Sequence, residues 1–308
     1  MLKYILKRLL YLIPVMFGVS LIIFAMMYFT PGDPARIILG ETATEAAVEQ
    51  LRDELGLNDH FVIQYGRWLF DAVRGDIGTS YQTRRPVVDE IMDRFPATFQ
   101  LAAAGVFVAV VIGIPIGIIS ATKQYSIFDN VSMFFALLGV SMPNFWQGLL
   151  LLLLFSLRLQ WLPSSGLEGF DSLILPAITL GTGSAAVIAR MTRSSMLEVI
   201  RQDYIKTARA KGQKESVIIT RHALKNALIP IITVIGLQFG ILLGGAVITE
   251  AIFTIPGVGT LMVGAISSRD FPVVQGGVLF IAIMFSLVNL VVDILYSFVD
   301  PRIKSQYK

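Results

Sequence analysis

The sequence predicts an all-α membrane protein with six transmembrane helices and both termini in the cytoplasm. Hydrophobic residues make up 55% of the 308 and charged residues only 15%, with a mean hydropathy of +0.70. This apolar excess is too large for a water-soluble domain to bury in one core. Because a charge at the bilayer centre costs roughly 2.5 to 3.5 kcal/mol, runs without Asp, Glu, Lys or Arg mark the spans. Six such runs are long enough to cross: 9–32, 95–122, 130–157, 172–189, 226–249 and 271–292.

The first run is expected to be a retained membrane helix. A cleaved signal peptide is the competing interpretation of the start. However, the run is longer than the roughly 7 to 15 apolar residues of a signal peptide. In addition, Thr30–Pro34 offers no small-x-small cleavage site. We therefore favour a helix that stays in the membrane.

The first connection, 33–94, is long and acidic overall, with seven basic residues against twelve acidic ones. We place it outside the cell, because long loops cross the membrane largely regardless of charge. Within it, Thr42 and Glu45 form a capping-box pattern ahead of the apolar Val48, and Gly56 supplies a stop. This pattern predicts a short surface helix.

Two later runs depart from a simple span. The run 172–189 is shorter than the roughly 20 residues that a span needs, so its helix should continue into Arg190 and Arg193, whose long stems can carry the charge toward water. A seventh charge-free run, 251–268, contains Pro256 and three glycines. These helix breakers would leave backbone groups unsatisfied in lipid, so we predict a loop or re-entrant segment packed against protein.

Basic residues near the span ends orient the chain, because cytoplasmic connections are enriched in Lys and Arg. Nine basic residues lie in the connection from Arg190 to Lys225, and three more precede the first span. The alternate short connections carry only Arg158 and Arg269. The connection rich in basic residues is therefore cytoplasmic together with both termini, as an even number of spans requires.

That cytoplasmic connection contains two amphipathic segments. Four apolar side chains recur at every fourth residue and predict one ridge along a single helix: Met196, Ile200, Tyr204 and Ala208. Gly212 is expected to end this helix, since glycine adopts a left-handed cap at little cost. A second segment, 217–224, leads to the fifth span, which we expect to start near Pro230. The residues alone also fit a basic loop that lies on anionic lipid headgroups.

Several kinds of chemistry have no residues to support them. The chain has no cysteine, and its two histidines, His60 and His222, are expected on opposite sides of the membrane, so no metal or cofactor site is predicted. No G-x-x-x-x-G-K-[ST] phosphate loop is present for ATP. The net charge is only +3, without a basic stripe interleaved with aromatic residues, which argues against nucleic acid as a partner.

The predicted spans contain no ionisable residue at mid-depth. Glu250 and Asp293 fall at span ends, where we interpret them as solvated or interfacial carboxylates. An ion-coupled carrier usually binds its ion near the midplane, and a passive channel needs a selectivity ring, so both are alternatives without visible residues. A membrane-embedded enzyme likewise lacks a nucleophile or metal set. Energy for active transport would have to come from another subunit.

The stretch Tyr204–Gly212 resembles the coupling segment of the permease subunits of ABC importers. Those permeases share the pattern Glu-Ala-Ala, three residues, then Gly; set on Gly212, it places residues 206–208 at the first three positions. Of these, Ala208 matches, together with the glycine. The wider run 198–230 is similar to the form carried by bacterial importers of peptides, glutathione and nickel.

Further stretches resemble the same subgroup, and together they cover nearly the whole chain in order. They are Pro31–Pro34, Gln64–Tyr65 with Trp68, Gly75–Ser80, Arg94–Thr98, Ile255–Gly259 and Asp300–Arg302. Each alone is weak, but the ordered set is specific. The stretch Arg84–Ile91 is similar to the glutathione-type members.

The resemblance implies the type I permease fold of ABC importers, as one subunit of a larger importer in the bacterial inner membrane. The partners it implies are a second, similar permease chain forming a heterodimer, two cytoplasmic ATPase subunits, an external solute-binding protein and membrane lipid. The permease would not itself be an enzyme, because the partner ATPases hydrolyse ATP. The implied substrate is a di- or oligopeptide, glutathione included, with nickel as the alternative.

The same resemblance divides the chain and assigns its contact with the ATPases. The divisions are a first transmembrane helix (1–30), an external region with short helices (31–94), a permease domain of five helices (95–299) with a coupling segment at about 196–226, and a cytoplasmic tail (300–308). The contact residues are expected to be Tyr204, Thr207, Ala208, Arg209, Ala210, Lys211 and Gly212. Residues that line the transport pathway are not assigned.

Overall fold

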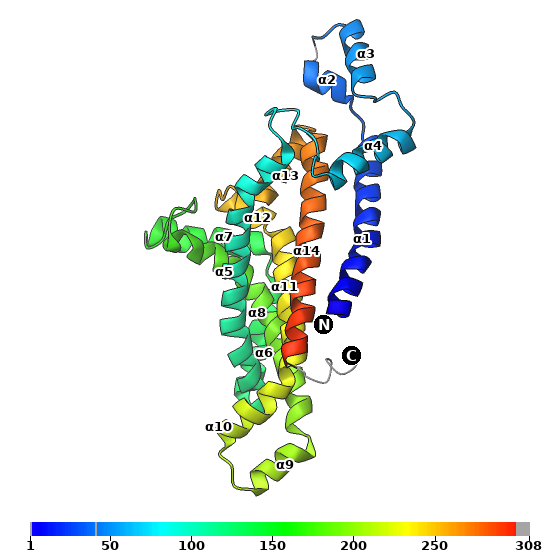
Figure 1. Ribbon diagram of the computed structural model, residues 1–308. Coiled ribbons are helices and arrows are strands. Elements are labelled where there is room, and N and C mark those ends of the chain that lie inside the picture. The colour runs from blue at the N-terminus through cyan, green and yellow to red at the C-terminus, as the bar shows by residue number, and fades with distance from the viewer. Residues whose placement is uncertain (1, 41, 300–308) are drawn as a thin grey trace.

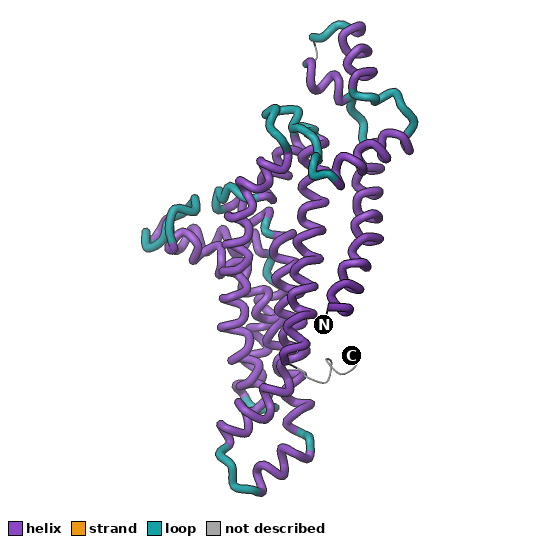
Figure 2. The backbone as a smooth tube through the Cα atoms, in the orientation of Figure 1, coloured by secondary structure: helices purple, strands orange, loops and turns teal. Residues whose placement is uncertain are grey.

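The chain forms an elongated helical bundle in the computed structural model, which describes residues 2–40 and 42–299 (Figure 1). In chain order its elements are α1 (Leu2–Phe29), α2 (Pro34–Leu39), α3 (Glu45–Glu54), α4 (Phe61–Val73), α5 (Val87–Thr122), α6 (Ile127–Ser141), α7 (Asn144–Leu151), the π-helical η1 (Leu152–Arg158), α8 (Phe170–Ile200), α9 (Asp203–Ala210), α10 (Glu215–Val217), the π-helical η2 (Ile218–Leu224), α11 (Lys225–Gly245), α12 (Val247–Ile252), α13 (Val258–Ser267) and α14 (Phe271–Val299). Figure 2 shows helix throughout this described part, with loops only between helices. The predicted tail, 300–308, lies outside the described residues.

The two ends of the bundle carry different parts of the chain. Helices α2 and α3 lie beyond one end, α4 lies beside that end, and helices α9 and α10 form the other, as Figure 1 shows. We refer to these as the α3 end and the α9 end. The acidic first connection and the connection with nine basic residues thus lie at opposite ends, as the charge pattern predicts.

Helices α5 and α8 form the centre of the bundle, and small residues let their backbones approach closely. A Cβ atom added at Gly117 would lie 2.6 Å from the carbonyl oxygen of Ala189. One added at Gly181 would lie 2.7 Å from the carbonyl oxygen of Gly105. No side chain larger than hydrogen fits at these two contacts unless the helices separate.

The third predicted span is not one straight helix. Helix α6 ends at Ser141, and the α7–η1 helix leaves it at an angle of 100°. Pro143 causes the break, because a residue before proline is driven out of the helical region, and Met142 is extended with φ −82° and ψ 121°. The predicted continuous helix over 130–157 is therefore wrong. Five helices are long and apolar enough to span a membrane, or six if the bent pair counts as one span.

The remaining span boundaries are confirmed in part. Helix α8 continues through Arg190 and Arg193, as predicted, and reaches Ile200. Helix α5 begins at Val87, eight residues before the charge-free run 95–122. Asp89 and Glu90 in its first turn favour a helix start there. Helix α11 starts at Lys225, one residue before the predicted run 226–249, but the expected helix entry at Pro230 is wrong, because this proline lies inside α11.

The seventh charge-free run is interrupted where its proline and glycines predict, but it is more helical than a loop. Helices α12 and α13 are short, and a turn over 253–257 joins them. Val258, Gly259 and Ala265 of α13 are buried. The segment packs against protein, as expected.

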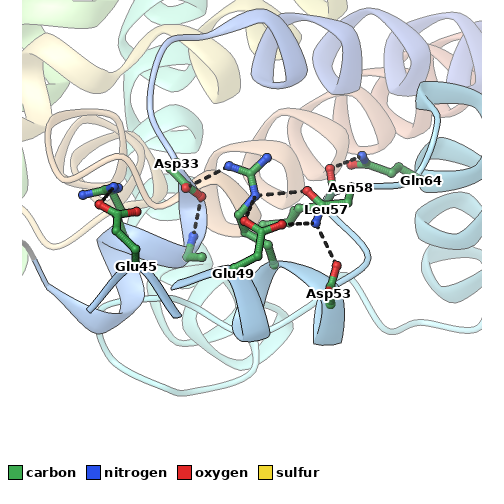
Figure 3. Close-up of polar contacts among 10 residues, drawn as sticks. Asp33, Glu45, Glu49, Asp53, Leu57, Asn58 and Gln64 are labelled. Carbon is green, nitrogen blue, oxygen red and sulfur yellow. Dashed lines mark hydrogen bonds and ion pairs between the residues drawn. The ribbon is translucent and has the colours of Figure 1, made fainter. Parts of the chain in front are cut away.

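A polar network holds the small helices at the α3 end together (Figure 3). The Arg52 guanidinium donates to Asp33 at 3.1 Å and to Asn58 at 3.1 Å. Asp33 also caps α2 by accepting the backbone N–H of Ala35. The predicted surface helix exists as α3, but its cap is Thr44, which accepts from the N–H of Ala47, and not Thr42.

Candidate coupling segment

The candidate coupling segment begins where α8 leaves the bundle at the α9 end. Helix α8 stops at Ile200, and α9 starts anew at Asp203 after a short break. Gln202, at the N-cap of α9, is extended with φ −69° and ψ 150°. The predicted single helix with one ridge from Met196 to Ala208 is therefore wrong, since the break rotates the face that α9 presents.

Ile205 is the residue that anchors α9, and the four-residue spacing did not indicate it. Its side chain is fully buried in a cluster with Met196 of α8 and Ile218, Ala223, Ala227 and Ile231 of the helical run that follows. Tyr204, which the spacing placed on the ridge, is 44% exposed. A pattern that restarted at Asp203 would have found Ile205, the one large aliphatic residue in α9.

Gly212 ends α9 in the predicted way. Its φ is +75°, in the left-handed region that favours glycine. The N–H of Gly212 donates to the carbonyl of Arg209 at 2.9 Å, and that of Gln213 reaches back to the carbonyl of Ala208 at 3.3 Å. These bonds satisfy carbonyls that the helix end leaves free. We call the turn 211–214 the knuckle.

Two polar contacts brace the knuckle from the second half of the segment. Arg209 donates through Nε and Nη2 to the two oxygens of Glu215, which makes a bidentate pair. Gln213 and the His222 imidazole lie 2.8 Å apart. The knuckle is thus held on both sides, by α10 and by η2.

Six of the seven predicted contact residues are exposed at the α9 end, and Ala208 is half-buried. Because they surround a short helix whose inner side is anchored by Ile205, a partner can reach them without disturbing the bundle. The structure therefore brings the predicted residues together on one accessible feature.

A buried ion pair secures the base of this end. Arg193 of α8 donates through Nε and Nη2 to both oxygens of Asp129 on α6, each at 2.8 Å. Asp129 is also hydrogen-bonded by the Ser120 hydroxyl of α5 and by the backbone N–H of Tyr125 at 2.9 Å. The pair thus ties three helices together a short distance before α9 begins.

The described residues offer little for catalysis or metal binding. They contain no group of three or more His, Cys, Asp or Glu side chains that could hold a metal ion. His60 occupies the N-cap position of α4 at the α3 end, without a side-chain capping bond, whereas His222 lies in η2 at the α9 end. The two imidazoles are at opposite ends, as the sequence predicted.

The bundle and its exposed α9 end define the class of the chain as a polytopic helical membrane protein. The chain belongs to the family described as binding-protein-dependent transport system inner membrane component. The model of that family matches residues 113–305, and the model of its N-terminal part matches residues 1–102. The protein is therefore a multi-pass component of a bacterial inner membrane.

Individual relatives match along almost the entire chain. The dipeptide transport system permease protein DppB of Alkalihalophilus pseudofirmus is 48% identical, over 99% of this chain and 100% of that protein. The glutathione transport system permease protein GsiC of Escherichia coli is 44% identical, over 99% of each chain. Among solved structures, the inward-facing methionine ABC transporter MetNI matches with a TM-score of 0.56 at 19% identity, over 68% of this chain and 96% of that one. This last likeness supports the ABC importer permease fold.

Proposed function

We propose that this chain is one of two similar permease subunits of an ATP-driven importer, and that the importer carries di- or oligopeptides, glutathione included, into the cell. The support for the substrate class comes from the relatives named for dipeptide and glutathione transport, which align over nearly the full length. Neither of these relatives is named for nickel, and no observation favours the nickel alternative. Two ATPase subunits and an external solute-binding protein complete the proposed assembly.

The observation that carries the coupling role is the exposed knuckle over the buried Ile205. An ATPase that closes against the α9 end would push on α9 and the knuckle. Because Ile205 packs against Met196 of α8 and Ile231 of α11, the push would reach both helices through close-packed side chains. The Arg209–Glu215 pair would keep the two halves of the segment moving together.

Transport by the reconstituted importer tests the substrate class. Proteoliposomes that contain this chain, its partner permease, the ATPases and the binding protein are expected to accumulate a radiolabelled dipeptide only when ATP is present. An excess of unlabelled dipeptide should compete, and an excess of Ni²⁺ should not. Competition by Ni²⁺ alone, without effect from peptides or glutathione, would replace the peptide proposal by the nickel alternative.

The proposed orientation places the α9 end in the cytoplasm and the α3 end outside. Since the chain has no cysteine, single-cysteine variants can be labelled with a membrane-impermeant maleimide in intact spheroplasts. We expect labelling at Glu45, Gly166 and Ser268 and protection at Gln213. Labelling at Gln213 together with protection at Glu45 would invert the orientation and exclude a cytoplasmic ATPase contact.

A further inference from the structure

Glu250 is a buried carboxylate that takes no part in the proposed coupling segment. The sequence indicated a solvated or interfacial side chain, and that interpretation is wrong, because Glu250 is 0% exposed. It lies on α12, in the half of the bundle toward the α3 end (Figure 1). Burying a charge without compensating partners is costly, so the groups around this carboxylate decide what it does.

The partners of Glu250 come from two other helices. The Thr98 hydroxyl of α5 donates to Oε1 at 2.7 Å, and the backbone N–H of Thr260 in α13 donates to Oε2 at 2.9 Å. The same Thr98 oxygen accepts the N–H of Val258 at 2.9 Å. Two backbone donors in the first turn of α13 are thus satisfied by side chains from α12 and α5. A negative charge is also favourable at that place, because the helix dipole is positive there.

Two glycines provide the room for the carboxylate. A Cβ atom at Gly257 would lie 2.2 Å from Cδ of Glu250, and one at Gly259 would lie 2.8 Å from its Oε2. The stretches Arg94–Thr98 and Ile255–Gly259, which are far apart in the sequence, therefore meet at this single side chain. We call Glu250, Thr98 and the first turn of α13 the carboxylate clasp.

The clasp lies between two apolar clusters. Leu101 and Phe253 belong to one of them, and Ile91 and Val258 belong to the other. Apolar contacts are non-directional and allow helices to slide, whereas hydrogen bonds in a low-dielectric interior fix one register. Of the contacts among α5, α12 and α13, the clasp is therefore the part that specifies their relative position.

We infer that Glu250 is a positioning residue for transport, which locks the α12–α13 hairpin onto α5 so that they move as one body when the pathway changes its opening at the α3 end. This inference rests on the proposed function, because the movement it involves is that of a transport pathway. The coupling segment lies at the opposite end and does not depend on the clasp.

The test compares solute uptake with ATP hydrolysis in one preparation of the complete importer. In Glu250→Gln the side chain becomes neutral: its amide oxygen can still accept the Thr260 N–H and its amide N–H₂ can donate to the Thr98 oxygen, but both charge-assisted bonds become weaker neutral ones. We expect uptake to fall about tenfold or more, because the weakening of two buried bonds to a charged group is worth about that factor. ATP hydrolysis measured without binding protein should stay within about twofold of wild type, because the clasp is distant from the α9 end and shares no partner with it. A clasp that only stabilised the fold would lower both in proportion.

Thr98 supplies a matched pair of variants. Thr98→Ser keeps the hydroxyl and should transport like wild type, whereas Thr98→Val keeps the shape, loses the hydroxyl and should behave like Glu250→Gln. If Glu250→Gln does not assemble, the Thr98 pair decides the question. A single cysteine at the exposed Ser267 of α13 gives a direct readout: its rate of maleimide labelling should depend on ATP in the parent, and should lose that dependence in Thr98→Val.

Two outcomes would overturn the inference: wild-type uptake in both Glu250→Gln and Thr98→Val, or a proportional loss of uptake and ATP hydrolysis. Either result leaves the proposed function in place as long as the parent importer transports. Absence of ATP-dependent uptake in the parent would instead be a failure of the proposed function itself.

Discussion

Replacing Gly212 by valine is expected to abolish most uptake while the chain remains folded and inserted in the membrane. The φ of +75° at this residue is sterically excluded for a β-branched side chain, and forcing it costs about 1–3 kcal/mol locally. That cost is too small to unfold the bundle, but it is large enough to change the knuckle. A Cβ atom at Gly212 has no atom within 4 Å, so the effect arises from the backbone alone.

The measurement is uptake and binding-protein-stimulated ATP hydrolysis in proteoliposomes, and both should fall about tenfold or more, since 1.4 kcal/mol corresponds to a factor of ten. The matched control is Gly212→Asn, because asparagine tolerates the left-handed region far better than valine. It should retain most of the activity. Wild-type activity in Gly212→Val would mean that the segment is a loop lying on lipid headgroups, and the coupling role would have to be abandoned.

Breaking the Asp129–Arg193 pair is expected to have the largest effect on stability. The side chain of Asp129 is 3% exposed and that of Arg193 is 25% exposed. Two nitrogens of Arg193 donate to the two carboxylate oxygens of Asp129. Removing one partner of a buried pair leaves an uncompensated charge, which typically costs about 3–5 kcal/mol. Asp129→Ala should therefore lower the melting temperature of the purified complex strongly. Arg193→Lys should do so to a lesser degree, because lysine keeps the charge but cannot bind both oxygens.

The control is the surface pair Arg36–Glu45, whose side chains are largely exposed. Exposed pairs contribute about 0–1 kcal/mol, so Glu45→Ala should leave the melting temperature almost unchanged. The double variant Asp129→Ala/Arg193→Ala should recover part of the loss, because it leaves no lone buried charge. Equal, small shifts for Asp129→Ala and Glu45→Ala would contradict the importance of the buried pair.

The sequence predicted those features that depend on local chemistry. Charge-free runs located the spans because a membrane penalises charge wherever it occurs. The left-handed turn at Gly212 was predicted because only a few residue types adopt it cheaply, and the structure confirms it. The break at Met142–Pro143 is equally local, because Pro143 is visible in the sequence, but the absence of charge over 130–157 does not by itself indicate it.

Two other predictions failed because they depend on packing between helices. Glu250 was interpreted as solvated because its position at a span end is visible in the sequence, whereas Thr98, which satisfies it from α5, is 152 residues away. Similarly, the anchoring role of Ile205 follows from Met196 and Ile231, which only the fold brings beside it. Thr98 could not be assigned to Glu250, nor Met196 and Ile231 to Ile205, without knowledge of how α5, α8 and α11 pack.

The close fit of α5 against α8 also has a consequence for biosynthesis. About 50 residues separate the end of α5 from the start of α8, and at about 5–20 residues per second the ribosome needs several seconds to make them. During that interval α8 is not yet present to pack against the glycine-lined face of α5, which includes Gly117. Only lipid or the insertion machinery can cover this face. Helix α6 and the bent α7–η1 segment are synthesised before α8, so they enter the membrane before the contact between α5 and α8 can form. The centre of the mature bundle can thus form only after α8 has been made, and substitutions that enlarge these glycines should act during synthesis, as a loss of inserted protein.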